Sequence, residues 1–453
     1  MSVPLKHRGD NLRVKKILTR EGFTLFKSIP IIKMIAWTKL LLASILGSPL
    51  YILSKLIPKS DNIWVFGSTD GKFIDNSKYL YLYTKVHYPH IHTIWISKDI
   101  ATSTQLRKKG INAYYEFSLL GMLYSMRAKY VFVSSHIPND VNPYTIGNSK
   151  IVQLWHGVPL KVIEWDRFPR VKETLMYKLV KFFDKKIFSL FSYDYLLVPS
   201  IRLIEIFKRA FDIPEDSRLI IAGYPRNQAF LTPRAFKDQD KDEHITRIEK
   251  KISEYSAAIF YLPTFREAYE FNPFSKKYKF DKLMELLKEQ NILLLIKPHP
   301  RDTNLIRYLK KLKNQEDHVL VLSPYIDIYP LLTKCSILIT DYSSIFFDFM
   351  LTRKPIIFAA FDLDEYLSKD RGTYFEYTQI VPGPVTKDWV EVREHVEKYI
   401  LTKTKTYVPK IDRILIKTLQ LDQVFCKNAS SKIIKQVIRH ELNPKSQSVK
   451  QRE

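Results

Sequence analysis

Polar and charged side chains gather at five places in this chain, and each place directly follows a short apolar run. The five places are residues 155–161, 223–227, 263–267, 297–302 and 341–344. Short apolar runs predict buried strands, and ligands of open α/β sheets bind outside the carboxyl ends of the strands. The five places together hold two histidines, several cations and several hydroxyls. Cations beside helix N-termini suit a doubly charged phosphoanhydride.

The stretch around Asp341 shows this arrangement most fully. Residues 337–339 predict a strand, Ser343 and Ser344 a polar turn, and residues 345–351 a helix with an apolar side. The free N–H groups at the start of such a helix favour an anion, and the serine hydroxyls add further donors. A plain helix cap without a ligand is the open alternative.

Two histidines stand at predicted strand ends. His156 follows the run 151–154, and His299 follows the run 292–296. An imidazole titrates near neutral pH and can act as a base or bind a phosphate. A histidine in such a position is more often a structural hydrogen-bonding group. Gly157 and the prolines beside His299 nevertheless predict tight turns from which the two rings can project.

Two other kinds of site are disfavoured. His87, His90 and His92 have no nearby cysteine or paired carboxylate to complete a ligand set, so no metal site is expected. The sequence contains no Gly-x-x-x-x-Gly-Lys-Ser/Thr loop, which argues against a P-loop nucleotidase.

Composition limits the partners. The chain has 453 residues, which predicts two or three domains, and a formal net charge of +25. Such a charge calls for nucleic acid, an anionic membrane surface or phosphate-rich substrates. Nucleic acid is the weakest candidate, because no basic motif interleaved with aromatic residues is present. Cys335 and Cys426 give no disulfide framework and suit a reducing compartment.

The N-terminal part of the chain differs from the rest. Residues 1–20 are basic, and residues 23–57 are apolar with lysines flanking or interrupting them. The longest uncharged run, 40–54, is shorter than the ~20 residues that span a bilayer. We therefore expect residues 1–60 to form a membrane-associating segment that lies on the cytoplasmic face. A buried helical hairpin is the alternative.

From residue 61 the chain alternates between apolar runs and amphipathic segments, which predicts βαβ units and parallel sheets. Helices are expected near 77–87, 103–109, 118–127, 171–190 and 201–210, then near 281–290, 303–313 and 327–334. The polar, charge-rich residues 231–250 predict a linker. We expect two doubly wound, Rossmann-type lobes at 61–235 and 246–405 with a cleft between them, followed by C-terminal helices and a basic tail at 406–453.

The strand-end motifs stand in the order seen in one family. They are Trp155-His-Gly157 with Lys161, Gly223-Tyr-Pro-Arg226, Leu262-Pro-Thr-Phe-Arg266, Lys297-Pro-His-Pro300 and Thr340-Asp-Tyr-Ser-Ser344. With Asp75-Asn-Ser-Lys-Tyr79 near the start and Asp362, Arg371 and Gly372 near the end, the chain resembles the CDP-glycerol glycerophosphotransferase family, the teichoic acid primases and polymerases of the TagB/TagF type. The resemblance covers about residues 61–400. Asn227 departs from it where an acid is expected, and Ser77 departs where proline is frequent.

The resemblance implies a GT-B-like fold, a peripheral or monotopic membrane attachment, and transfer of a polyol phosphate from a CDP-alcohol to a lipid-linked glycan or polyol-phosphate acceptor. No cofactor is implied beyond the CDP-alcohol donor. In this scheme His156, in the N-terminal acceptor lobe, is the general base, and His299 is the second catalytic residue. The donor phosphates and CDP would contact Arg226, Thr264, Arg266, Lys297, Asp341, Ser343 and Ser344. The polyol or acceptor would contact Gly157, Lys161, Asp348, Asp362 and Arg371.

Two other functions stay open at this point. One is a GT-B glycosyltransferase or epimerase that uses a UDP-sugar, although no Glu-rich sugar-donor motif is evident in the second lobe. The other is a protein that binds nucleotides or anionic glycans without turnover. The sequence does not distinguish glycerol from ribitol, a primase from a polymerase, or teichoic acid from a phosphopolyol capsule.

Overall fold

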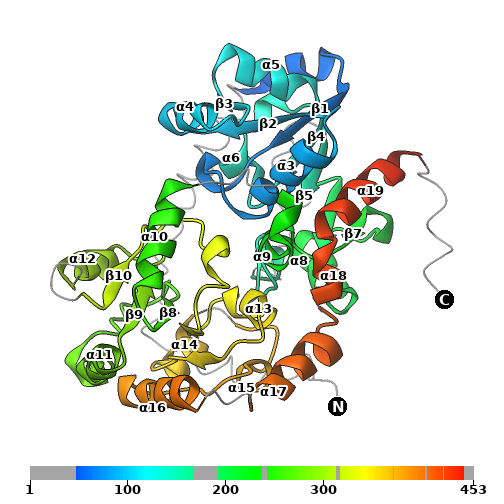
Figure 1. The fold of residues 1–453 in the computed structure, drawn as a ribbon. Coiled ribbons are helices and arrows are strands. Elements are labelled where there is room, and N and C mark those ends of the chain that lie inside the picture. Colours follow the sequence, from blue (N-terminus) through cyan, green and yellow to red (C-terminus); the bar gives the residue numbers. More distant parts are fainter. Residues whose placement is uncertain are drawn as a thin grey trace, which may run out of the picture.

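The computed structural model describes residues 47–167, 192–236, 242–312, 317–370, 372–402, 406–421 and 423–442. Within them the chain forms two parallel sheets, each flanked by helices (Figure 1). The strands of the first sheet are β1 (Ser60–Phe66), β2 (His92–Ser97), β3 (Ala113–Tyr115), β4 (Ala128–Val133), β5 (Lys150–Gln153), β6 (Tyr195–Val198) and β7 (Leu219–Ile221). Those of the second are β8 (Ala257–Leu262), β9 (Ile292–Ile296), β10 (Val319–Val321), β11 (Ile337–Thr340) and β12 (Ile356–Phe358). The predicted α/β fold with parallel sheets is confirmed.

The order of the strands fixes where a ligand can bind. The first sheet runs β3-β2-β1-β4-β5-β6-β7 and the second runs β10-β9-β8-β11-β12. In each sheet the strands are first added on one side of the first strand and then on the other. The strand order therefore reverses between β1 and β4 in the first sheet and between β8 and β11 in the second. Ligands of doubly wound sheets bind at this reversal, outside the carboxyl ends of the strands.

Burial explains the apolar strands. All five residues of β9 are buried, and all of β11 and β12 are buried too. A parallel sheet covered by helices on both faces needs such continuous apolar strands. The covering helices include α3 (Asp75–His87), α4 (Ile100–Lys108), α5 (Leu119–Arg127), α6 (Ile137–Asp140), α8 (Ile204–Phe211), α9 (Pro225–Leu231), α10 (Glu243–Ser253), α11 (Phe280–Glu289), α12 (Thr303–Leu312), α13 (Ile345–Met350), α14 (Leu363–Lys369), α15 (Tyr377–Ile380), α16 (Trp389–Leu401), α17 (Val408–Asp412), α18 (Gln423–Lys427) and α19 (Ala429–Leu442).

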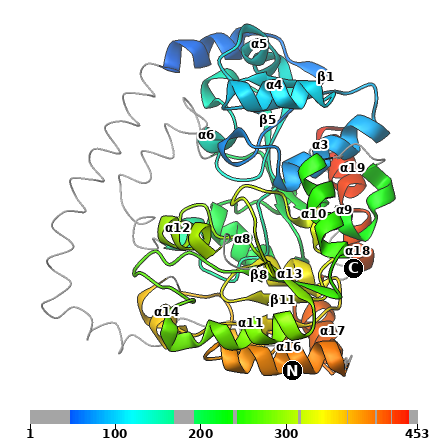
Figure 2. The ribbon, with the colours of Figure 1, turned by 60° about the vertical axis from the view of Figure 1, so that its left-hand side comes forward.

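The C-terminal helices return to the first lobe. Helices α18 and α19 contact α9, and α19 also contacts α3 and the edge strand β7. The Gln436 side chain accepts from the backbone N–H of Ile221 and donates to its carbonyl, both at 3.1 Å. It thereby satisfies the open edge of β7. Figures 1 and 2 both show α19 alongside the first lobe, at a distance from β8 and α11.

Two predicted elements differ from the structure, and two others lie wholly or partly outside the described residues. The expected linker at 231–250 is wrong in its second half, because α10 begins at Glu243 and buries Ile245. The helix expected near 327–334 is only the 3-10 turn Tyr329–Leu331, since Pro330 leaves too little chain for a helix. The helix expected at 171–190 lies outside the described residues, as do residues 1–46 of the predicted membrane segment. Residues 47–56 are helical, and no helix of the described chain is long and apolar enough to cross a bilayer.

Candidate active site

A pocket of about 220 Å³ lies between the two lobes. Ile74 and Asp75, which follow β1, line its first-lobe side. The second lobe contributes residues that follow β8, β9, β10 and β11. These are Pro263, Lys297, Pro298, His299, Ile326, Asp327, Ile328, Tyr329, Ser343 and Ile345, together with Leu262 at the end of β8. The pocket thus lies at the strand reversal, where a ligand is expected in this fold.

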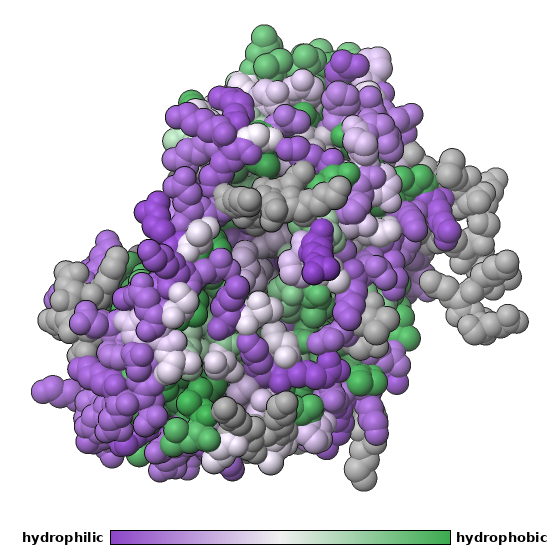
Figure 3. Space-filling view, viewed as in Figure 1, coloured by the Kyte–Doolittle hydropathy of each residue, from purple (hydrophilic) through white to green (hydrophobic). Residues whose placement is uncertain are grey.

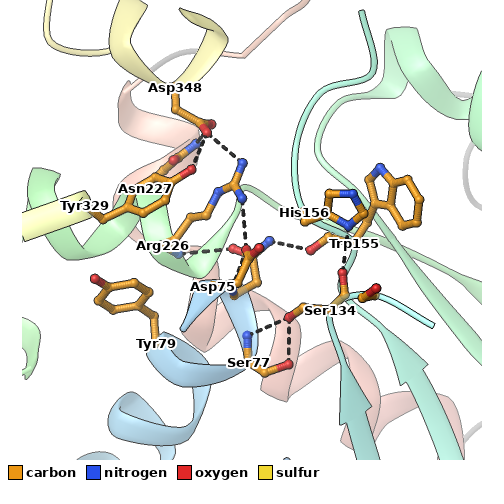
Figure 4. A network of polar contacts seen from close by, with 12 residues as sticks. Asp75, Ser77, Tyr79, Ser134, Trp155, His156, Arg226, Asn227, Tyr329 and Asp348 are labelled. Carbon is orange, nitrogen blue, oxygen red and sulfur yellow. Dashed lines mark hydrogen bonds and ion pairs between the residues drawn. The ribbon is translucent and has the colours of Figure 1, made fainter. Parts of the chain in front are cut away.

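His156 follows β5 and is held by one backbone contact. Its Nδ1 lies 2.9 Å from the carbonyl oxygen of Ser134. A carbonyl can only accept, so Nδ1 carries the proton and Nε2 of the neutral ring keeps its lone pair. The surrounding protein lowers the pKa of His156, and nearby Asp75 partly offsets this effect. The ring reaches solvent, and its lowered pKa leaves it neutral near pH 7, so it can act as a base. Figure 4 shows the contact of its Nδ1 with Ser134.

His299 has the opposite arrangement. Its Nδ1 accepts the backbone N–H of Arg301 at 3.2 Å, so the neutral ring carries its proton on Nε2. Burial, and then repulsion by Lys297, Arg301 and Lys161, lowers the pKa of His299 to about 4. The ring is therefore a neutral hydrogen-bond donor at pH 7, suited to an anionic oxygen.

Lys297 is the pocket cation closest in sequence to His299. Burial lowers its pKa, and Asp327 acts in the opposite direction. Within the described part of the chain Lys297 has no ion-pair partner within 4 Å, so its charge is available to a phosphate in the pocket. Ser343 adds a hydroxyl on the same side.

The two arginines expected to bind the donor are not among the residues that line the pocket. Arg266 bonds to Asp341 at 2.8 Å and to Asp362 at 2.8 and 2.9 Å, with all three side chains at most 3% exposed. Arg226 bonds to Asp75 at 2.9 Å and to Asp348 at 2.6 Å. Both arginines are buried, and each pairs with two carboxylates of the protein. Their predicted contact with the donor phosphates stays a prediction.

The same two networks hold three carboxylates that were predicted to contact the donor, the polyol or the acceptor. Asp348 also accepts from Asn227 at 2.9 Å and from Tyr329 at 2.7 Å. Asp362 accepts from Tyr269 at 2.6 Å and from Tyr342 at 3.0 Å. Asp341 accepts the backbone N–H groups of Thr264 and Tyr342. None of the three is among the residues that line the pocket. They fix the strand ends on which the pocket is built.

Of the other predicted site residues, Gly157, Lys161 and Ser344 contact residues of the opposite lobe. Ser344 approaches Gly157, where an added Cβ would meet Ser344 Oγ and Arg226 Nη2 at 3.0 Å each. Lys161 lies over the ring of Tyr366 and pairs through its backbone with Thr373 of the second lobe. Arg371 lies outside the described residues. Helix α13, expected to offer an anion site, has six residues and no side-chain cap bond at Ser344.

Residues 75–79, to which the sequence analysis gave no role, connect the surroundings of His156, Arg226 and Asp327. At the start of α3, Asp75 bonds Arg226, and Asn76 donates to the carbonyl of Trp155 at 2.7 Å. Ser77 bonds Ser134, while Lys78 and Tyr79 both reach Asp327 at 2.7 Å. The motif was visible in the sequence, but its partners are 50 to 250 residues away.

Comparison with known proteins gives the family. Residues 50–439 match the model of CDP-Glycerol:Poly(glycerophosphate) glycerophosphotransferase. This match covers well over half of the chain. The chain belongs to the CDP-glycerol:poly(glycerophosphate) glycerophosphotransferase family.

Relatives in this glycerophosphotransferase family agree with the assignment. The chain is 31% identical to a teichoic acid poly(glycerol phosphate) polymerase of Bacillus spizizenii, over 78% of this chain and 86% of the relative. It is 30% identical to the polymerase of that name from Staphylococcus epidermidis over 80% of this chain, which is about half (48%) of the relative's length. A solved wall teichoic acid polymerase, TagF, in a histidine-to-asparagine variant soaked with CDPG, superposes with a TM-score of 0.68. It is 26% identical and covers 94% of this chain and 100% of that one.

The two departures from the glycerophosphotransferase motifs have structural partners here. Asn227 donates to Asp348, so a carboxylate at 227 would face another carboxylate. Ser77 bonds Ser134 through both its backbone N–H and its hydroxyl, at 2.9 and 2.7 Å. Ser134 is the residue whose carbonyl sets the His156 tautomer, so the departure at 77 bears on the base.

Proposed function

We propose that this protein transfers glycerol phosphate from CDP-glycerol to a hydroxyl of a membrane- or lipid-linked acceptor, releasing CMP, in teichoic acid or phosphopolyol capsule synthesis. The observation that carries the proposal is an interlobe pocket lined by His299, a neutral hydrogen-bond donor, and by Lys297, a cation without an ion-pair partner among the described residues. The neutral base His156 lies close to Asp75, which lines the same pocket. Family membership supports the choice of CDP-glycerol, and the names of the relatives support glycerol phosphate as the transferred group.

The residues divide the reaction between the lobes. Nε2 of His156 takes the proton of the acceptor hydroxyl, and the freed oxygen attacks the phosphorus that bears the glycerol. The bond from that phosphorus to the CMP oxygen breaks, and CMP leaves with the electron pair. His299 donates from Nε2 and Lys297 supplies charge to the phosphoryl oxygens as negative charge develops. The product is a new phosphodiester, and the proton leaves through His156.

A donor panel tests the proposal. The full chain is incubated with an acceptor and with CDP-glycerol, CDP-ribitol or UDP-N-acetylglucosamine, and nucleotide release is measured. We expect CMP release with CDP-glycerol above the other donors. UDP release would favour the glycosyltransferase alternative, and tight binding of CDP-glycerol without CMP release would favour a binding protein. The length distribution of the product separates a primase from a polymerase.

For location we propose peripheral attachment to an anionic membrane through the first lobe. Large apolar side chains there are exposed on two adjacent elements, the helix at 47–56 and α5 with the two residues before it. They are Ile52, Leu53, Leu56, Phe117, Leu119, Leu120 and Leu123, with exposures of 41 to 79%. The two elements lie side by side in Figures 1 and 2, and apolar side chains gather at this end of the molecule in Figure 3. We call these seven residues the apolar patch.

Two features favour a lipid partner over a protein. Lys55 and Arg127 lie on the same two elements, and the net charge of +25 favours anionic headgroups. In the sequence, residues 23–46, directly before the helix, are also mainly apolar. Flotation with phosphatidylglycerol vesicles tests this role. Leu56→Glu/Leu119→Glu should reduce binding, whereas the control Ile416→Glu, an exposed apolar residue of the chain's C-terminal part, should not. Unchanged flotation of the double variant would place the attachment elsewhere.

A further inference from the structure

Asp75 is the one pocket-lining residue of the first lobe that carries a charge, among the residues described. It stands at the first position of α3 with φ of 64°. This is the left-handed region, which a residue other than glycine enters at a cost of about 1 kcal/mol, and such positions cluster at functional sites. The backbone at 75 therefore holds the carboxylate in a place that ordinary helix geometry would not give it.

One oxygen of Asp75 is used by the protein and the other is not. Oδ1 accepts from Nη1 of Arg226 at 2.9 Å and from the backbone N–H of Asn76 at 2.7 Å. Oδ2 has no hydrogen-bond partner in the described parts of the chain, and the side chain keeps 19% of its exposure. Figure 4 shows Asp75 between Arg226 and the residues around His156.

The second carboxylate of the pocket has no such capacity. Asp327 Oδ2 accepts from Lys78 and Tyr79, both at 2.7 Å, and Oδ1 accepts from the backbone N–H of Tyr329 at 3.1 Å. Asp327 therefore holds the lobes together, while Asp75 is left to meet a ligand.

The charges around the pocket decide which part of the ligand can contact Asp75. Phosphate oxygens are attracted to Lys297 and His299 and are repelled by a carboxylate. The group that lies against Asp75 must be uncharged and must carry O–H donors. In a CDP-alcohol the polyol meets this requirement, and it is one ester bond away from the reacting phosphorus.

We propose that Asp75 Oδ2 accepts a hydrogen bond from a hydroxyl of the donor's polyol and so makes Asp75 a residue that determines polyol specificity. This inference rests on the proposed function. The pair with Arg226 orients the Asp75 carboxylate. A charge-assisted bond of this kind is expected to favour the hydroxylated donor by about 10- to 100-fold.

Two ligands isolate the hydroxyl contact. Calorimetry without acceptor compares CDP-glycerol with CDP-1-propanol. The second ligand has the same carbon chain and charge, but its alcohol portion carries no free hydroxyl. In the unaltered chain CDP-glycerol should bind about 10- to 100-fold more tightly. In Asp75→Gly, which relaxes the backbone at φ 64° and removes the carboxylate, the two affinities should become equal within about threefold. Asp75→Asn tolerates the same φ and keeps one neutral acceptor, so its ratio should fall between the two.

The control is Asp327→Asn, the pocket carboxylate whose oxygens are occupied. It should shift both affinities by the same factor and leave their ratio unchanged, as a purely structural change would. An unchanged ratio in both Asp75 variants would overturn the inference while leaving the proposed function in place. The same holds if the unaltered chain binds both ligands equally. If the unaltered chain binds neither ligand and releases no CMP, the proposed function fails and this inference fails with it.

Discussion

His156 and His299 bind backbone groups of opposite polarity through the same ring atom. Nδ1 of His156 donates to the carbonyl of Ser134, whereas Nδ1 of His299 accepts the N–H of Arg301. The neutral rings therefore present opposite Nε2 atoms, a lone pair on His156 and a proton on His299. Desolvation by the surrounding protein and nearby positive charges lower the pKa of both rings, so both are neutral at pH 7. The two backbone contacts therefore assign His156 as the base and His299 as the hydrogen-bond donor to the phosphoryl oxygens.

Removal of the base should affect turnover more than binding. His156→Ala should lower CMP release by ~10²–10⁴-fold while CDP-glycerol affinity in calorimetry stays near that of the unaltered chain. His318→Ala is a matched control, because His318 also bonds a backbone carbonyl through Nδ1, at 3.0 Å, but directly precedes β10 and so lies at the amino end of that strand, opposite the carboxyl ends that bear the pocket. Loss of donor binding together with a lowered melting temperature would instead assign His156 a structural role.

The pH dependence follows from the lowered pKa of His156. A base must be unprotonated, so kcat/KM should rise with pH along an acid limb whose midpoint lies below the ordinary value of 6.5. The rate should be flat from about pH 7 upward until another group titrates. Initial rates in a series of buffers measure the limb. A midpoint above pH 7 would contradict the assignment.

Arg266 should prove structural. Its removal leaves Asp341 and Asp362 buried without their cation, so Arg266→Ala should lower the free energy of unfolding by about 3–5 kcal/mol in urea. The control Arg353→Ala breaks a half-exposed pair with Asp412 and should cost at most about 1 kcal/mol. A stable Arg266→Ala protein that has lost donor affinity would restore the arginine to the donor site.

Asp140 should make stability depend on pH. Burial raises its pKa to about 7, against two backbone N–H bonds from Ser134 and Ser135 that lower it. A folded pKa above the unfolded one of 3.8 means that the folded state binds the proton more tightly. This group's contribution to stability is therefore present at low pH and is lost as pH rises from about 4 to about 7, by on the order of 4 kcal/mol.

Asp140→Asn removes that titration. The difference in unfolding free energy between the variant and the unaltered chain should grow in the variant's favour between pH 4 and 7. Urea melts at four pH values measure it. Parallel pH curves for the two proteins would contradict the prediction.

The sequence by itself determined the class of fold and the place of the chemistry. Apolar runs such as 292–296 could only be strands buried on both faces, and the polar residues after them had to lie at one sheet edge. This rule, which depends on local periodicity and on the direction of parallel strands, predicted that His156, His299, Lys297 and Ser343 lie after strands, and the last three of them line the pocket.

Tertiary structure decided which charges are free. In the sequence Arg226, Arg266 and Lys297 are equivalent cations at strand ends. Only folding brings Asp348 to Arg226 and Asp362 to Arg266, across 122 and 96 residues, and leaves Lys297 for a ligand. The tautomers of the two histidines and the left-handed backbone of Asp75 are likewise set by distant or strained contacts. A local pattern records residue type and spacing, but a charge or proton position depends on whichever partner the fold places within 3 Å.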